Sequence, residues 1–330
     1  MRLPSFVIAG AGLVLVSAAH AQGGPVNPAC TDPSVVGSAM QAGEACQRAF
    51  DSFGYASQQY GVLLSAGNME LGRADALGGF PHFRLAFRAT GMVVFAPGFQ
   101  TVNIPVGPAE PGSIYTQSYD FATIEINGML GLFKGFPVGS THMGAVDAWA
   151  SLNVVPGASA SGYSVTPQSK FYLSIGGRVG LLAEGNGIPG VAVSFFQRNM
   201  PKSNVAANDQ VGSAIAIHDF KIDTHAWSAT VGKHFGVVGL LVGAGQTHFA
   251  SSGVVGWTVS DTAGAANPTV SASSTQTQYF GDFSLTLGQV DLVLEVGEVF
   301  GSTLKTYNTF DPHSDWGRSF ASAAITFGHY

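Results

Sequence analysis

Alternation with a period of two residues, with charges kept to one face, is the feature that most restricts how this chain can fold. In the first such segment Phe83, Leu85 and Phe87 fall on one face, and Arg84 and Arg88 fall on the other. Successive side chains of a strand point to opposite faces of a sheet, so the pattern predicts strands with one apolar and one polar face. Five segments show it: 83–95, 121–132, 170–184, 277–287 and 290–298.

Composition indicates which surface the apolar face meets. Charged residues make up 10% of the chain, against about 25% in an average soluble domain. The mean hydropathy is +0.25, yet no stretch after the N-terminal region approaches the ~18 consecutive apolar residues of a membrane helix. A closed barrel is the other structure that satisfies every backbone group inside lipid. The net charge of −6 excludes a basic nucleic-acid surface.

We therefore predict an all-β fold, a transmembrane antiparallel up-and-down β-barrel of about 12–14 strands with a short helical N-terminal plug. Single-chain bacterial barrels have an even number of strands, and splitting 119–135 or subdividing strands elsewhere would raise the count from twelve to fourteen. The twelve predicted strands are 80–95, 119–135, 144–155, 170–183, 189–200, 211–222, 224–235, 237–249, 252–260, 274–288, 290–301 and 318–330.

A secreted β-sandwich binding module is the alternative fold, because its strands also alternate, with the apolar face turned inward. Two observations favour the barrel. The polar faces are thinly charged and rich in Ser, Thr, Gly, Asn and Gln, which suits a narrow lumen. Several segments also exceed the ~5–6 residues usual in soluble strands and match the ~9–11 needed to cross lipid at a tilt.

The first residues predict export. Arg2 provides a positive start, residues 6–16 form an apolar stretch, and Ala19-His20-Ala21 places small residues where signal peptidase cleaves. Residues 1–21 are thus a predicted signal peptide, and the predicted location is the outer membrane, as a monomer. The expected domains are this peptide, a plug segment at 22–78 that is helical and then Gly-rich, and the barrel at 79–330.

Cys30 and Cys46 are the only cysteines, and a disulfide between them suits an oxidising compartment. Asp32-Pro33 reads as an N-cap followed by proline at the first helical position. One unbroken helix would hold the cysteines about 24 Å apart at 1.5 Å per residue. If they pair, the helix must break near Gly43; two free thiols are the alternative.

Charged residues on the polar faces carry both signs. They either pair with one another and hold the plug, or line a polar route with charge selectivity. The set comprises Arg84, Arg88, Glu125, Asp147, Lys170, Arg178, Glu184, Asp219, Lys221, Asp223, Asp282, Asp291 and Glu295. The candidates for ligand contact or lumen lining are Arg84, Arg88, Glu125, Lys170, Arg178, Asp282, Asp291 and Glu295.

No pattern in the sequence selects catalytic residues, a metal site or a cofactor. The common hydrolase, metalloprotease and nucleotide-binding motifs do not occur. The cluster at 311–315 resembles a set of cation ligands, but no second group with defined spacing accompanies it, and a polar turn explains it better. We expect no enzyme.

The Gly-rich stretch at 70–79 contains Gly72-Arg73-Ala74-Asp75 ahead of the first strand. It resembles the Gly-Arg-Ala stretch near the mature N-terminus of the long-chain fatty-acid and aromatic-hydrocarbon transporters of the outer membrane. The resemblance implies a barrel closed by an N-terminal hatch, with Gly72, Arg73, Ala74 and Asp75 in the plug, and passive uptake of small hydrophobic molecules. Family members have fourteen strands, more than we count here.

The expected partners are outer-membrane lipid, hydrophobic small molecules and the barrel-assembly machinery, which reads a terminal aromatic residue such as Tyr330. A structural or assembly barrel without transport is the alternative function.

Overall fold

The structure is a computed structural model. The predicted signal peptide and Tyr330 lie outside the residues that it describes. Those residues are 24–37, 42–97, 104, 106–155, 157–160, 162–185, 187–208, 212–259, 262–263, 267–301, 305–311 and 317–329.

Three helical segments precede the first strand: η1 (Pro28–Thr31), α1 (Pro33–Val36) and α2 (Gly43–Ser65). The predicted N-cap is confirmed, because Asp32 Oδ1 accepts a hydrogen bond from the backbone N–H of Ser34 at 2.9 Å. The hydroxyl and backbone N–H of Ser34 lower the pKa of the Asp32 carboxyl. Gly37, with φ of +87°, ends α1. The helix is therefore broken between Cys30 and Cys46, as a disulfide requires, although α2 is longer than the short helices expected.

The rest of the described chain is almost entirely strands: β1 (Phe83–Pro97), β2 (Ser113–Phe133), β3 (Phe136–Val138), β4 (Thr141–Met143), β5 (Ala145–Val154), β6 (Ala158–Ala160), β7 (Tyr163–Pro167), β8 (Phe171–Leu182), β9 (Gly190–Asn199), β10 (Ser203–Asn208), β11 (Ala214–Phe235), β12 (Val238–Val259), β13 (Thr262–Ala263), β14 (Thr269–Leu287), β15 (Val290–Phe300), β16 (Thr309–Asp311) and β17 (Arg318–His329).

Ten of these strands close into one antiparallel ring, in the order β1, β2, β5, β8, β9, β11, β12, β14, β15 and β17, with β17 pairing back to β1. The barrel prediction is confirmed, and the count of about 12–14 strands is wrong for the described chain. The predicted strands 211–222 and 224–235 form one strand, β11, and 237–249 and 252–260 form β12. The bulge between His218 and Lys221 shifts the pattern within β11, and Ser251-Ser252-Gly253 resembles a turn within β12.

Outward-facing apolar side chains form a continuous band, here called the apolar belt, around the ring. A β-sandwich buries its apolar faces between two sheets, so this arrangement excludes the sandwich alternative. The belt includes Leu85, Phe87, Ile124, Ile126, Leu173, Ile175, Val231, Val242, Phe283, Leu292, Leu294, Val296 and Ile325, all at least 38% exposed.

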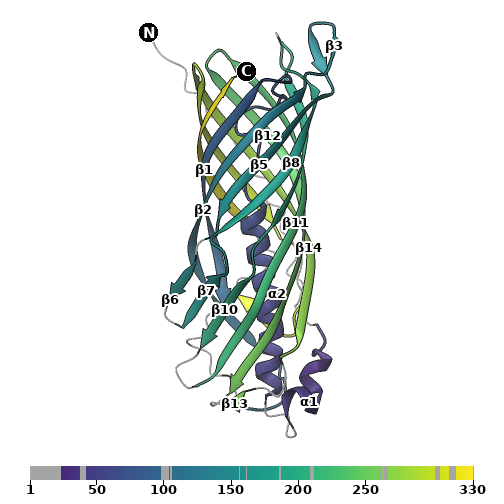
Figure 1. Cartoon of the computed structure of the whole chain (residues 1–330). Helices are drawn as coiled ribbons and strands as arrows, with labels where there is room; N and C mark the ends of the chain where they lie inside the picture. Colours follow the sequence, from purple (N-terminus) through teal and green to yellow (C-terminus); the bar gives the residue numbers. More distant parts are fainter. Residues whose placement is uncertain are drawn as a thin grey trace, which may run out of the picture.

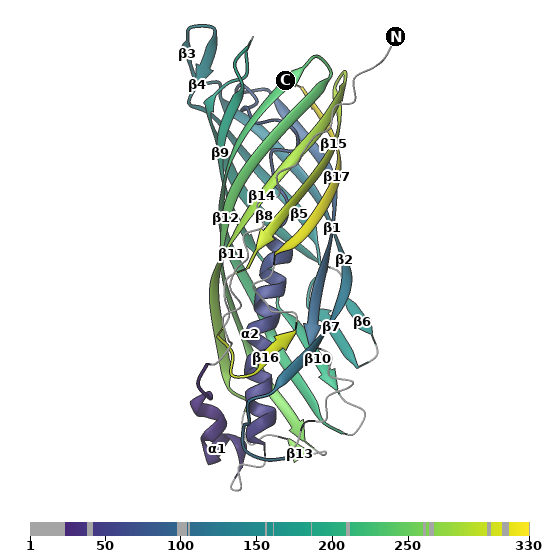
Figure 2. The same ribbon diagram turned by 180° about the vertical axis from the view of Figure 1, so that it is seen from behind.

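The two ends of the barrel differ in their connections. At the short-turn end, residues 236–237 join β11 to β12 and residues 288–289 join β14 to β15. At the long-loop end, residues 98–112 join β1 to β2, and residues 301–317, which include β16, join β15 to β17. Figures 1 and 2 draw the short-turn end at the top and the long-loop end at the bottom, beside α1.

Helix α2 lies inside the barrel and begins at the long-loop end (Figures 1 and 2). It packs there against apolar side chains of the wall, for example Phe53 against Phe220 with ring centroids 5.8 Å apart. On the outside of this half, β12 and β14 expose Gln246, His248 and Thr275. The wall is thus apolar inside and polar outside at the long-loop end, which is the reverse of the belt. None of the described helices is long and apolar enough to cross a membrane.

Candidate functional site

The lumen between α2 and the short-turn end contains most of the predicted charged residues. Glu184, Asp219, Lys221 and Asp223 do not point into it: Glu184 pairs with Lys233 and His234 at the rim, and the other three are partly exposed. The buried members are Arg84, Arg88, Glu125, Asp147, Arg178, Asp282, Asp291 and Glu295, each at most 5% exposed.

Lys170 is the one candidate that the structure places elsewhere. It is exposed and stands one residue before β8, where the chain enters the barrel from a loop at the long-loop end. The prediction that Lys170 lines the lumen is therefore wrong. The alternating pattern continues to residue 170, but β8 and its pairing with β5 begin at Phe171, so Lys170 lies outside the strand.

The segment that fills this lumen, residues 64–78, has no regular secondary structure after Ser65. Its backbone N–H and C=O groups therefore lack the partners that a helix or sheet would provide. Side chains of the wall supply them. Arginines donate to its carbonyl oxygens, as Arg84 does to Met69 at 3.0 Å and Arg178 does to Arg73 at 3.1 Å.

Asn68 is the centre of this arrangement. Its side-chain amide donates to Asp282 Oδ1 at 2.9 Å and also to Glu295, and its backbone N–H donates to Glu295 Oε2 at 3.0 Å. The Arg88 guanidinium donates to the Asn68 carbonyl and pairs with Glu125. A single residue of the segment thus contacts a set of wall charges of both signs.

A second cluster holds the end of the segment. Asp147 accepts from the backbone N–H of Leu77 at 3.1 Å and pairs with Arg178 at 2.7 Å. Both side chains of this ion pair are fully buried. The cluster fixes the chain just before it turns into β1.

The four residues of the Gly-Arg-Ala stretch lie within the filled lumen. Gly72 has φ of +86°, and a Cβ there would lie 2.8 Å from the Ser284 Cβ, so only glycine fits. Arg73 Nε lies 3.5 Å from Asp291 Oδ2, so the segment forms an ion pair with a buried carboxylate of the wall. Ala74 is buried. Among the described residues, Asp75 forms no ion pair.

An apolar cavity of about 260 Å³ lies in the long-loop half, between α2 and the wall. The described residues that line it belong to five regions of the chain. They are Ser52, Ala56, Gln59, Tyr60 and Leu63 of α2, Val94–Pro97 of β1, Tyr119–Ala122 of β2, Gly157, Ser159 and Tyr163 near β6 and β7, and Val205, Ala207, Ile215 and Ile217 of β10 and β11.

This cavity coincides with a discontinuity in the wall. β2 pairs with β1 from Thr116 onward, but its other edge pairs with β5 only from Glu125 onward. Opposite the remaining edge, β6 pairs with β7, and β7 pairs with β10. Tyr119 of β2 and Tyr163 of β7 face each other there, with stacked rings 6.1 Å apart.

Sequence reasoning missed both Asn68 and the cavity. Asn68 follows Gly67 in a stretch without periodicity, so nothing in the sequence distinguished it from a loop residue. The cavity depends on where the β2–β5 ladder stops, which alternation within one strand does not reveal. Among the described residues, no group of three or more His, Cys, Asp or Glu side chains is placed to hold a metal ion.

No protein-family model and no curated protein matches the sequence. Among solved structures, the translocator domain of the autotransporter NalP from Neisseria meningitidis is 10% identical over 74% of this chain and 88% of that chain, with a TM-score of 0.42. An outer-membrane channel from Pseudomonas putida F1 is 8% identical over 79% and 100%, with a TM-score of 0.31. The outer membrane phospholipase A of Escherichia coli is 9% identical over 82% and 97%, with a TM-score of 0.25.

All three TM-scores are below 0.5, so the class of the protein follows from its own strand pairing. A closed antiparallel ring that is apolar outside and polar inside within the belt is the architecture of an outer-membrane β-barrel. The protein belongs to this class and resides in the outer membrane.

Proposed function

We propose that the protein is a plugged barrel through which small hydrophobic molecules cross the outer membrane without an energy source. The observation that carries the proposal is the apolar cavity at the discontinuity between β2 and β7. A cavity of this size and lining suits a small apolar ligand, because most of its walls are apolar side chains and aromatic rings with few polar groups.

The position of the cavity supports entry from the membrane side. Val93 of β1 and Ile124 of β2 are exposed members of the apolar belt, at 40% and 55%, and the lining residues Val94 and Ala122 lie next to them along the strands. An apolar molecule dissolved at the edge of the lipid would thus reach the cavity past these apolar side chains.

The Gly-Arg-Ala stretch supports the same proposal, since it resembles transporters of hydrophobic compounds. In this chain it lies in the filled lumen, as a hatch would, and passage requires that residues 64–78 move. The ring of ten described strands departs from the fourteen of that family. A structural or assembly barrel without transport is the competing function, and the hydrogen bonds that hold residues 68–77 in the lumen favour it.

The proposal predicts that filling the mouth of the cavity slows uptake. Ala122 is exposed at the cavity, so Ala122→Trp should assemble and obstruct it. Ala250→Trp is the matched control, because Ala250 is exposed on β12, a strand that does not line the cavity. Initial uptake of radiolabelled naphthalene by cells with equal amounts of heat-modifiable barrel should fall at least tenfold for Ala122→Trp and stay unchanged for Ala250→Trp. Equal uptake by both variants and by cells without the barrel would contradict a transport function.

A further inference from the structure

The chain crosses the lumen lengthwise before it forms the wall. α2 begins with Gly43 at the long-loop end and runs toward the middle of the barrel (Figures 1 and 2). Residues 66–82 continue through the lumen, and β1 begins with Phe83 at the short-turn end, where Phe83 pairs with His329 and Leu130. Residues 24–37 therefore lie at the opposite end of the barrel from the start of the wall.

The structure also indicates which end faces the outside of the cell. Outer-membrane barrels have short turns on the periplasmic side and longer loops on the extracellular side. The turns at 236–237 and 288–289 thus face the periplasm. The apolar belt agrees, because β12 and β14 extend beyond it at the long-loop end with polar outer faces, as segments outside the lipid would.

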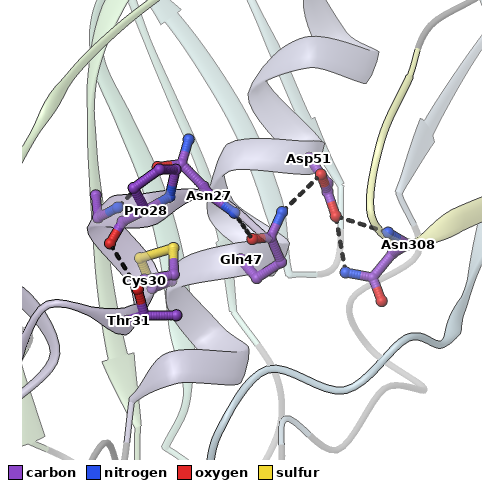
Figure 3. The surroundings of a disulfide bond; sticks show 9 residues. Asn27, Pro28, Cys30, Thr31, Gln47, Asp51 and Asn308 are labelled. Atoms are coloured by element: carbon purple, nitrogen blue, oxygen red, sulfur yellow. Dashed lines mark hydrogen bonds between the residues drawn. A yellow bond between two sulfur atoms is a disulfide. The ribbon is translucent and has the colours of Figure 1, made fainter. Parts of the chain in front are cut away.

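Several contacts fix the residues before α2 at this extracellular end (Figure 3). A disulfide joins Cys30 to Cys46 in the first turn of α2, with the Cα atoms 5.4 Å apart. The backbone N–H of Asn27 donates to Gln47 Oε1 at 2.7 Å. Gly24 N–H donates to the carbonyl oxygen of Thr306, in the loop that joins β15 to β17, at 3.0 Å.

The same loop is attached to the helix. Asp51 of α2 accepts from the side-chain amide of Asn308 at 2.8 Å and from its backbone N–H at 2.9 Å (Figure 3). Gln47 donates to the other oxygen of Asp51 at 3.0 Å, which connects the loop to Asn27 through the helix. Residues 24–37, the start of α2 and the loop at 305–311 are therefore joined to one another by the disulfide and these hydrogen bonds.

We infer that residues 24–36 are displayed on the cell surface, so that the barrel carries its own N-terminal segment across the outer membrane. A polypeptide joined ahead of Gly24 would be held outside the cell by the disulfide and by α2 in the lumen. This further function does not depend on uptake of hydrophobic molecules. It depends on the direction of α2 and on which end of the barrel faces outward.

Single cysteines test the inference in the full-length protein. Ser34 is exposed at the long-loop end and Gln289 is exposed in a turn at the short-turn end. The native cysteines are bonded to each other, so Ser34→Cys and Gln289→Cys each add one reactive thiol. A membrane-impermeant maleimide should label Ser34→Cys in intact cells as fully as in permeabilised cells. It should label Gln289→Cys at least tenfold less in intact cells.

The reverse pattern, or labelling of Ser34→Cys only after permeabilisation, would overturn the inference. If Ser34→Cys disturbs the disulfide, an epitope tag inserted between Gly23 and Gly24 provides the second measurement. Antibody should bind that tag on intact cells, and should bind a tag inserted between Gly236 and Val237 only after permeabilisation.

Discussion

Wall side chains at the short-turn end bind mostly the backbone of the segment that they enclose. Arg84, Arg88 and Arg178 each donate to a carbonyl oxygen of that segment, and Asp147 and Asp282 accept from its N–H groups. This explains why the sequence of residues 64–78 gave no sign of its partners. A wall that recognises peptide groups needs few charges in the segment itself.

Asn68 gives the sharpest prediction at this scale. Asn68→Ala removes the amide that donates to both Asp282 and Glu295, and leaves two buried carboxylates short of a donor. An unsatisfied buried group costs about 1–3 kcal/mol. We expect the barrel to assemble and the lumen segment to loosen, with at least a tenfold rise in the frequency of channel openings in planar bilayers.

Asn204→Ala is the control for that experiment, because Asn204 is exposed on β10. It should leave the frequency of openings unchanged. An Asn68→Ala protein as silent as the wild type would show that these hydrogen bonds do not close the lumen.

Among the elements, strands whose outer face meets lipid were the most predictable. In β1, β8, β15 and the C-terminal half of β14 most exposed residues are apolar and the charged residues of the inner face are buried, so alternation alone predicts these strands to within a few residues. The sequence pattern predicts two strands in place of β11 and two in place of β12. Beyond the lipid the inner faces of these strands pack against α2 and are apolar, as at Ile215, Ile217 and Trp257. Apolar residues there point inward and not outward, so the alternation changes phase within each strand.

The belt assignment predicts opposite effects of one substitution at two outward positions. Leu294 lies near the middle of β15 and is 60% exposed, so Leu294→Arg places a cation near the bilayer midplane at a cost of roughly 2–4 kcal/mol. Thr275 is exposed on β14 beyond the last β14–β15 pair, Thr277 with Phe300, and Thr275→Arg should be tolerated.

Heat-modifiable gel mobility of outer-membrane fractions measures both variants. The folded band should be strongly reduced for Leu294→Arg and unchanged for Thr275→Arg. Equal amounts of folded barrel would show that the belt has been placed at the wrong height.

For the whole molecule, the sequence predicted a barrel, an inner segment and a cysteine pair, and the structure contains all three. Neither the number of strands in the ring nor the presence of the cavity could be predicted from the sequence. Both are set by which strands pair and how far. The β1–β17 ladder, between strands at opposite ends of the described wall, closes the ring, and the β2–β5 ladder stops at Glu125. Alternation reports which way a residue points, but it does not report which strand lies beside it.

The central claim is that the N-terminal segment closes the barrel from within, and conductance in planar bilayers tests it most directly. A ring of about eight strands is already filled by its own side chains, so a ring of ten leaves space that α2 and residues 66–78 occupy. Deleting residues 24–78 should leave a barrel that assembles and forms a steady pore, while the intact protein stays nearly silent. An intact protein that conducts like an open porin, or a deletion that conducts no more than the intact chain, would contradict this account.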